Sequence, residues 1–473
     1  MKLSSILAGV AALTCASTAA MARPGADVIV GDLPNSFKWA GIVQGNGETL
    51  GAYSVATTSC NIGTVNLNWI DNSVNKPVIG QNFYRIKSVN GGTRFEQIGG
   101  SWLKHGFCAL QGTICLSGSP SMPSCSPTCG SCCQTLGIGC SDPYSNSRNG
   151  EQQRLGPRTD VNPWTGQFAW PYTIAFAQTG NSIFKRGQVW QYDLNPALNV
   201  GATYYVEGQY VARDDALAGN QNNNASYRRV LVGATPTGTP PTYNISHTGS
   251  TVRTLPAIWA WQAADPTNVV VQNVDDPAGG RVVVGYNVTD LGNGTWHYEY
   301  AIHNLTSDRA IRRVSIPVPT GVNLTNVEHR FVPMHSGEPK SSAPWTFSQS
   351  ATEASWTTEA FVSNANANAI TWGFTYNFRF DADQPPETVN ATLRTFKVEA
   401  DLGVSVKGPS APPPPACPGD ANGDNMIDAA DLSVLLSNFG QPAAGPGFGD
   451  FNGDGQCDGA DLSVLLGQFG SSC

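Results

Sequence analysis

Two acidic loops near the C-terminus carry residue types and a spacing that suit a hard cation. The loops are residues 420–431 and 450–461, and position 7 of each offers a backbone carbonyl, that of Met426 or Gln456. Ca²⁺ takes six to eight oxygen ligands, and side-chain oxygens at positions 1, 3, 5, 9 and 12 let a loop wrap around one ion. The sequence therefore predicts two calcium sites. Their side-chain ligands are Asp420, Asn422, Asp424, Asp428 and Asp431 in the first loop, and Asp450, Asn452, Asp454, Asp458 and Asp461 in the second.

The segment after each loop must hold the last ligands in place, and both segments read as the same short helix. An apolar stripe occurs in each copy, and Gly440 and Gly470 stand where a helix is expected to stop. One loop and helix could not bury such a stripe alone, so we expect the two stripes to pack face to face. Their members are Leu432, Leu435, Leu436 and Phe439, and Leu462, Leu465, Leu466 and Phe469.

Residues 417–473 resemble a dockerin domain, the duplicated calcium-loop module that attaches secreted enzymes to a cohesin on a scaffold. As in dockerin loops, both copies have Asp at position 12, where an EF-hand has Glu. The segment departs from the cellulosomal pattern, because Ala429-Ala430 and Gly459-Ala460 replace Ser or Thr and neither helix contains Lys or Arg. The resemblance implies calcium binding, and a cohesin-like or other cell-surface receptor as partner.

The charge of the chain is concentrated in this module. Residues 417–473 contain eight Asp and no Lys, Arg or Glu, so the formal net charge of −8 lies there and the remaining 27 acidic and 27 basic residues balance. Carboxylates this dense repel one another unless cations neutralise them. The near-neutral remainder argues against a nucleic-acid partner.

The flanking segments indicate export. Residues 1–22 read as a signal peptide, with Lys2, an apolar run at 6–13 and Ala20-Met21-Ala22 as the cleavage site. Residues 406–416 contain four consecutive prolines and read as a semi-rigid linker. No segment is long and apolar enough to be a transmembrane helix. We therefore expect a secreted protein, extracellular or attached to the cell surface.

The cysteines fit an oxidising compartment. The cargo region has an even number, which predicts four disulfides, with adjacent Cys132 and Cys133 bonded to different partners. The alternative is a zinc knuckle formed by Cys125, Cys129 and Cys132. Cys417 and Cys473 bracket the calcium module and could join its ends, while Cys457 reads as a small buried hydrophobe. The eight cargo cysteines are Cys60, Cys108, Cys115, Cys125, Cys129, Cys132, Cys133 and Cys140.

The cargo itself is predicted to be mainly β. Residues 370–380 alternate strictly between apolar and mostly polar positions, as do residues 296–302, and long helical stripes are absent before the calcium module. The predicted fold class is a β-sandwich-type cargo of antiparallel strands with a disulfide-rich insert, followed by a small all-α module. The predicted parts are a β-rich region at 23–233, a Thr/Pro/Gly-rich connection at 234–256 and a β-sandwich at 257–405.

One strand of the cargo carries a cluster of potential metal ligands. On this strand, His297, Glu299 and His303 fall on the face opposite the apolar side chains of the 296–302 segment. Two His and a carboxylate at strand spacing could hold Zn²⁺ or Cu²⁺, and a solvated strand face is the alternative. Such a metal would support a metal-dependent oxidoreductase or hydrolase, which is one hypothesis for the cargo.

Polysaccharide is the second class of ligand that the sequence suggests. Dockerin-bearing proteins are often polysaccharide-degrading enzymes, and Trp164 and Trp170 lie in a Pro/Gly-rich loop as possible sugar contacts. A glycoside hydrolase needs two facing carboxylates, which the sequence cannot pair. The hypotheses are thus a displayed hydrolase, a displayed carbohydrate binder, or a structural or adhesive envelope protein without activity. Isolated candidates for the carboxylates are Glu96, Asp160, Glu299, Glu328 and Glu359.

Overall fold

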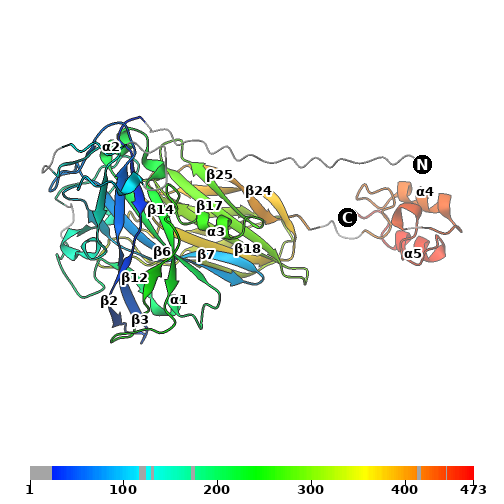
Figure 1. Cartoon of the computed structure of the whole chain (residues 1–473). Helices are drawn as coiled ribbons and strands as arrows, with labels where there is room; N and C mark the ends of the chain where they lie inside the picture. Colours follow the sequence, from blue (N-terminus) through cyan, green and yellow to red (C-terminus); the bar gives the residue numbers. More distant parts are fainter. Residues whose placement is uncertain (1–23, 117–123, 129–132, 172–175, 413–416, 444) are drawn as a thin grey trace, which may run out of the picture. The chain divides into compact units, whose positions relative to one another are not determined.

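The chain divides into two units, Met1–Ser410 and Ala411–Cys473, and each is described by itself (Figure 1). Strands dominate the first unit and helices the second, so the prediction of a mainly β protein with a small helical module is confirmed. The predicted signal peptide lies outside the described residues. The computed structural model describes residues 24–116, 124–128, 133–171, 176–412, 417–443 and 445–473.

A large antiparallel sheet forms the first part of the cargo. Its strand order is β15-β14-β13-β6-β7-β12-β3-β2, and β8 pairs with both β6 and β11. The strands are β2 (Ser36–Val43), β3 (Thr49–Val55), β6 (Val78–Val89), β7 (Gly92–Gly100), β8 (Leu103–His105), β11 (Leu155–Gly156), β12 (Gly187–Trp190), β13 (Thr203–Val211), β14 (Ala225–Val232) and β15 (Ile245–His247). Two small sheets accompany it, β1 (Val28–Asp32) with β4 (Thr57–Asn61) and β10 (Ser141–Tyr144), and β5 (Leu67–Asn68) with β9 (Thr135–Leu136).

Two five-stranded antiparallel sheets form the sandwich of the cargo. The inner sheet has the order β16 (Val269–Asp275), β17 (Arg281–Asp290), β18 (Trp296–Asn304), β23 (Thr375–Ala382) and β20 (Leu324–Arg330). The outer sheet has the order β21 (Thr346–Gln349), β22 (Glu353–Thr357), β19 (Ile311–Pro317), β24 (Pro386–Thr395) and β25 (Asp401–Pro409).

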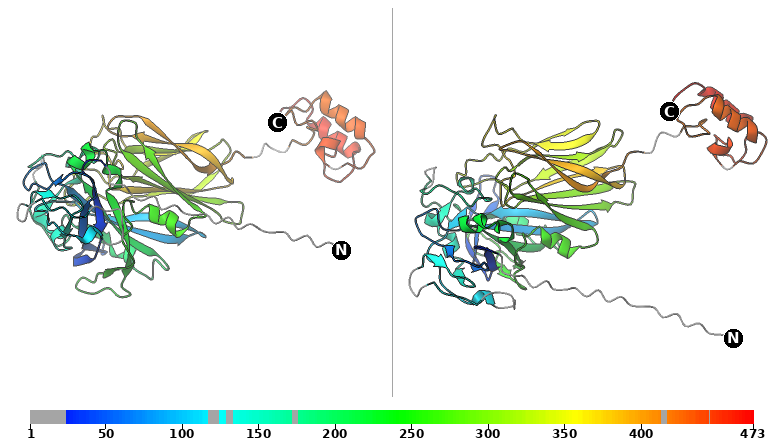
Figure 2. Two further views of the ribbon diagram at one scale, coloured as in Figure 1. Left: turned by 45° about the horizontal axis from the view of Figure 1, so that its top comes forward. Right: turned by 90° about the horizontal axis from the view of Figure 1, so that it is seen from above.

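The central strands β18 and β23 of the inner sheet are buried on both faces. The alternating apolar residues expected from the sequence, Tyr298, Tyr300, Phe378 and Phe380, pack on the outer sheet. On the opposite face β7 packs against β17, β18 and β23, so three layers of strands lie one on another (Figure 2). The polar positions of β18 and β23 therefore face another sheet instead of solvent.

Short helices connect the strands of the first unit. The helix α3 (Trp259–Ala264) packs Trp261 against Phe95 on β7, and Phe95 stacks on Tyr84 of β6, which adds an apolar patch between the layers. The helices are α1 (Gln191–Leu194), α2 (Arg213–Leu217) and α3 (Trp259–Ala264), with 3-10 turns η1 (Ile114–Leu116), η2 (Arg148–Gly150), η3 (Gln152–Arg154), η4 (Arg158–Asp160) and η5 (Gln221–Asn223).

Two segments that were predicted as a connection and a linker contain β-strand residues. The predicted connection at 234–256 contains β15, which pairs with β14, because its Ile245–His247 segment is extended beside Val230 to Val232. The predicted linker at 406–416 overlaps β25, whose pairing with β24 extends to Pro409. Residues 413–416 lie outside the described part of the chain.

Disulfide bonds cross-link the cysteine-rich insert of the cargo, as expected. They join Cys60 to Cys115, Cys108 to Cys133 and Cys125 to Cys140. The zinc alternative is wrong, because the sulfur of Cys125 is bonded to Cys140 and offers no thiolate. Cys129 and Cys132 lie outside the described residues, so a fourth cargo bridge stays a prediction.

Candidate functional site

The first residue of each acidic loop organises the turn that follows it. The carboxylate of Asp420 accepts the backbone N–H groups of Gly423 and Asn425 at 2.7 and 2.9 Å. In the second loop, Asp450 accepts those of Gly453 and Gly455 at 2.7 and 3.1 Å. Asn425 has φ of +65° at position 6, a left-handed conformation that Asn tolerates better than most residues.

The last residue of each loop ties the loop to its helix, α4 (Ala429–Asn438) or α5 (Gly459–Gly467). The buried carboxylate of Asp431 accepts the N–H groups of Ala421, Asn422 and Asp428 at 2.8, 3.2 and 2.8 Å. This places Asp431 in a capping box whose N-cap is Asp428. One side chain therefore closes the loop and starts the helix.

The second loop repeats this arrangement around Asp461. Its carboxylate accepts the N–H groups of Phe451, Asn452 and Asp458 at 2.8, 3.0 and 2.9 Å, and Asp458 is the N-cap of α5. Burial acts to raise the pKa of Asp461, but these N–H groups outweigh it and lower that pKa. The carboxylate therefore stays ionised, as a calcium ligand must.

The side-chain oxygens of the second loop converge as a cation site requires. Asp450, Asp454 and Asp461 each place a carboxylate oxygen within 4.8 Å of the others. Ligands at 2.3–2.6 Å from one Ca²⁺ lie at such separations, so the donor set fits the ion. In the first loop Asp420 lies near the sulfurs of Cys417 and Cys473, which are bonded to each other and are not thiolate ligands.

The two halves of the module are held together by reciprocal backbone contacts. Ile427 of the first loop donates its N–H to Ser471 at 2.9 Å, and Cys457 of the second donates to Gln441 at 3.0 Å. The disulfide between Cys417 and Cys473 joins the ends, as expected, and Cys457 is a buried free thiol. The turn η6 (Pro446–Phe448) lies between the halves in sequence.

The packing of the helices differs from the expected face-to-face stripes. Leu435 and Leu465 are fully buried, together with Ile427 and Cys457, and Phe451 packs against them with 8 % of its surface exposed. The stripe prediction is wrong for the outer members, because this core is too small to cover the whole width of each stripe. Two matched apolar pairs remain exposed, Leu436 with Phe439 and Leu466 with Phe469.

Residues 418–469 match the family model of the dockerin type I domain. The chain therefore carries a dockerin-type domain. Dockerin type I domains typically bind Ca²⁺, and they bind cohesins on cell-surface scaffolds. Proteins with a dockerin are typically extracellular or attached to the cell surface. None of the curated proteins compared with the chain matches it.

Among the described residues, no helix of this dockerin-bearing chain has the length and apolarity needed to span a membrane.

The potential metal ligands of β18 are buried between the sheets, so the expectation of a solvated face is wrong. His297 Nε2 lies 3.0 Å from Glu299 Oε1, and its Nδ1 bonds Asp381 on β23. Burial lowers the pKa of His297, but the two carboxylates outweigh it and raise that pKa. His303 instead bonds Thr375 at 3.0 Å. The structure thus brings His297 and Glu299 together but gives His303 a different partner, and a second metal site stays a prediction.

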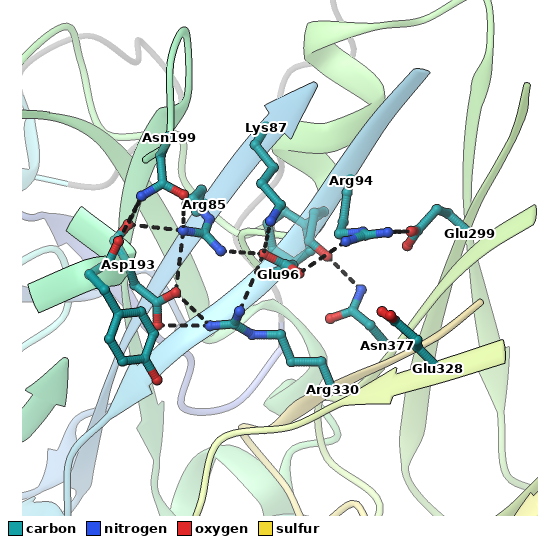
Figure 3. A network of polar contacts seen from close by, with 12 residues as sticks. Arg85, Lys87, Arg94, Glu96, Asp193, Asn199, Glu299, Glu328, Arg330 and Asn377 are labelled. Carbon is teal, nitrogen blue, oxygen red and sulfur yellow. Dashed lines mark hydrogen bonds and ion pairs between the residues drawn. The ribbon is translucent and has the colours of Figure 1, made fainter. Parts of the chain in front are cut away.

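Glu96 on β7 is the centre of a buried ion-pair network between the first sheet and the sandwich (Figure 3). Arg85 lies 2.5 Å from its carboxylate, and Arg94 bridges Glu96 and Glu299. Burial acts to raise the pKa of Glu96, but Arg330, Arg85 and Lys87 outweigh it and lower that pKa to about 2. Further cations within 4 Å are Lys87, Arg330 and Arg379.

The other predicted carboxylates do not join this pair in an open cleft. Glu328 on β20 is exposed and bonds Arg379 at 2.8 Å. Glu359 is exposed and accepts Asn364 Nδ2 at 2.7 Å. Asp160 lines a separate cleft of about 200 Å³. Arg94 and Arg379 each link Glu96 to Glu299. Arg379 also pairs with the exposed Glu328, so the partners that these predicted carboxylates share are arginines.

That separate cleft joins two sequence segments far apart in the chain. Glu338 accepts the N–H groups of Thr159 and Arg158 at 2.7 and 3.3 Å, and so binds the start of η4. Burial raises the pKa of Glu338. Asp308, also at the cleft, pairs with Lys397 at 2.7 Å. Glu338 therefore ties the segment after β20 to η4, and Asp308 ties together two loops of the sandwich.

The two predicted sugar contacts are half-buried. Trp164 packs against Gly279, and Trp170 lies under the ammonium group of Lys76, which is 3.6 Å from the ring centroid. The ring of Trp170 is also 5.5 Å from that of His105. Their role in sugar binding stays a prediction.

Sequence reasoning missed another aromatic pair at the surface, in which Tyr192 is exposed and Trp190 is half-buried. Trp190 at the end of β12 and Tyr192 in α1 stack with ring centroids 5.7 Å apart and an angle of 12° between planes. Because β12 ends at Trp190 and Tyr192 already belongs to α1, the alternation of a strand does not pair these rings, and only their closeness in the chain could have pointed to them.

Proposed function

We propose that the chain is a secreted protein that a calcium-loaded dockerin domain attaches to a cohesin-like receptor, and that its cargo binds polysaccharide. The observation that carries the attachment is the match of residues 418–469 to dockerin type I domains. Each loop would hold one Ca²⁺. The side chains at positions 1, 3, 5, 9 and 12 and the carbonyls of Met426 and Gln456 would supply its oxygens.

The exposed side chains of the helices support docking to a receptor. Leu436 and Phe439 on the first helix, and Leu466 and Phe469 on the second, are apolar and exposed in a module that has no Lys or Arg. Apolar anchors surrounded by polar atoms are typical of protein interfaces. We therefore expect an apolar contact with the receptor, in which either copy of the duplicated face can take part.

The receptor contact predicts a combined effect of the two copies. Leu436→Asp with Leu466→Asp should reduce capture of the full chain on an immobilised cohesin by at least about 100-fold, near 2.7 kcal/mol. Each single change should cost less, because the other face stays intact. Surface plasmon resonance in Ca²⁺ and in EGTA measures both effects. Ser433→Ala on the same helix is the control, since its hydroxyl bonds only Ala429 within the helix. Undiminished capture by the double variant would contradict the proposed face.

The ion pairs argue against Glu96 and Glu299 as the carboxyl pair of a glycoside hydrolase. A glycoside hydrolase needs one carboxyl group that donates a proton and a second that acts as base or nucleophile. Glu96 has a pKa near 2 because arginines surround it, so it is ionised at neutral pH and cannot serve as that acid. Glu299 shares two arginines with Glu96, namely Arg94 and Arg379. Release of reducing ends from polysaccharides by the full chain would overturn the binding role in favour of hydrolysis.

A further inference from the structure

We infer that a groove between the first sheet and the sandwich binds an uncharged polysaccharide chain along the Trp190–Tyr192 pair. The inference deepens the proposed polysaccharide role and rests on it. The groove has a volume of about 430 Å³, within the range of about 300–1,000 Å³ that ligand sites occupy. No predicted sugar contact lies in its wall.

The walls come from elements far apart in the sequence. Leu50 on β3 and Ile98 on β7 are buried apolar residues of the first sheet. Trp190 and Tyr192 form one aromatic wall, and Phe331 comes from the segment that follows β20 in the sandwich. A sugar ring presents an apolar C–H face and a rim of hydroxyl groups. Aromatic rings with a few polar neighbours match that pattern.

The charged groups of the groove neutralise one another. The carboxylate of Asp193 accepts two hydrogen bonds from Arg330 Nη2, at 2.8 and 2.7 Å, and lies 3.2 Å from Arg85 (Figure 3). Burial, with Arg158 nearby, lowers the pKa of His335 to about 4, so its ring is neutral at pH 7. An anionic chain would find no unpaired cation among these groups, whereas hydroxyl groups can bond their polar edges.

The same contacts make the groove rigid. Asp193 belongs to α1, and Arg330 is the last residue of β20, so their bidentate bond ties the aromatic segment to the sandwich. Arg85 also bonds the carbonyl oxygen of Asp193 at 3.0 Å. A preformed site loses little conformational entropy when a ligand binds.

Affinity electrophoresis of the full chain with Ca²⁺ tests the groove. The gels contain barley β-glucan, glucomannan or xyloglucan as uncharged probes, and polygalacturonate or alginate as anionic ones. Trp190→Ala with Tyr192→Ala should weaken binding to an uncharged probe about tenfold or more. Phe37→Ala is the matched control, since Phe37 on β2 is 41 % exposed and Tyr192 is 39 % exposed. Tyr192→Ala alone decides the question if the double variant does not fold.

The outcomes separate the groove from the proposed function. Weakened binding in the groove variants with an unchanged Phe37→Ala supports the inference. Binding to an uncharged probe that both groove variants retain overturns the groove but leaves the polysaccharide role. Binding to anionic probes alone overturns the uncharged ligand class and leaves that role as well. A wild-type chain that no probe retards overturns both.

Discussion

Replacing Asp431 and Asp461 together with alanine is expected to abolish calcium binding by the C-terminal module. Each carboxylate accepts three backbone N–H groups and completes the capping box of its helix. The substitution removes a predicted position-12 ligand and also leaves those donors without their acceptor, which costs about 1–3 kcal/mol when such groups are buried. Calcium affinity should fall by at least roughly 100-fold, measured by calorimetric titration of the full chain.

The single variants test whether the two calcium loops depend on each other. The first loop bonds Ser471 after the second helix, and the second loop bonds Gln441 after the first. Asp461→Ala should therefore weaken binding at both loops, because each loop is held by the chain beyond the other helix. Asp290→Ala is the control for charge, because Asp290 is the exposed last residue of β17 in the cargo. Two calcium heats of wild-type size in the double variant would rule out position 12 as a ligand.

The features that the sequence predicted well are those written in local patterns. The acidic loops repeat with the same spacing, and a helix with an Asp N-cap follows each. The alternation of Tyr298, Tyr300, Phe378 and Phe380 likewise identifies the strands of the sandwich and their apolar face. In both cases residues close in the chain carry the whole signal.

The features that could not be predicted depend on contacts between distant residues. The face of β18 that carries His297 and Glu299 is polar, and a polar face normally indicates solvent. It is buried here because β7 of the first sheet packs on it. Arg94 on β7 and Asp381 on β23 supply the charged partners of this face, and both are remote from β18 in sequence. The exposure of Leu436 also depends on contacts between distant residues. The size of the core that the two halves of the module form together decides which residues of each stripe it covers.

Replacing Glu96 with alanine is expected to destabilise the cargo strongly. Its side chain is buried, and its removal leaves several cations in the interface without their common partner. Breaking a buried ion pair from one side costs about 3–5 kcal/mol. Urea denaturation followed by tryptophan fluorescence measures this loss. Glu328→Ala is the matched control, because Glu328 also pairs with Arg379 but its side chain is 61 % exposed. That pair should contribute at most about 1 kcal/mol.

Acid should reduce the difference in stability between wild type and Glu96→Ala. The pKa of Glu96 is about 2 in the folded protein and 4.5 without its neighbours. A depressed folded-state pKa contributes stability that is fully present above pH 4.5 and is lost as pH falls toward 2. Over that interval wild type should lose about 3 kcal/mol that the variant never had. Stability curves of the two proteins that stay parallel from pH 7 to pH 2 would mean that the carboxylate does not hold this interface together.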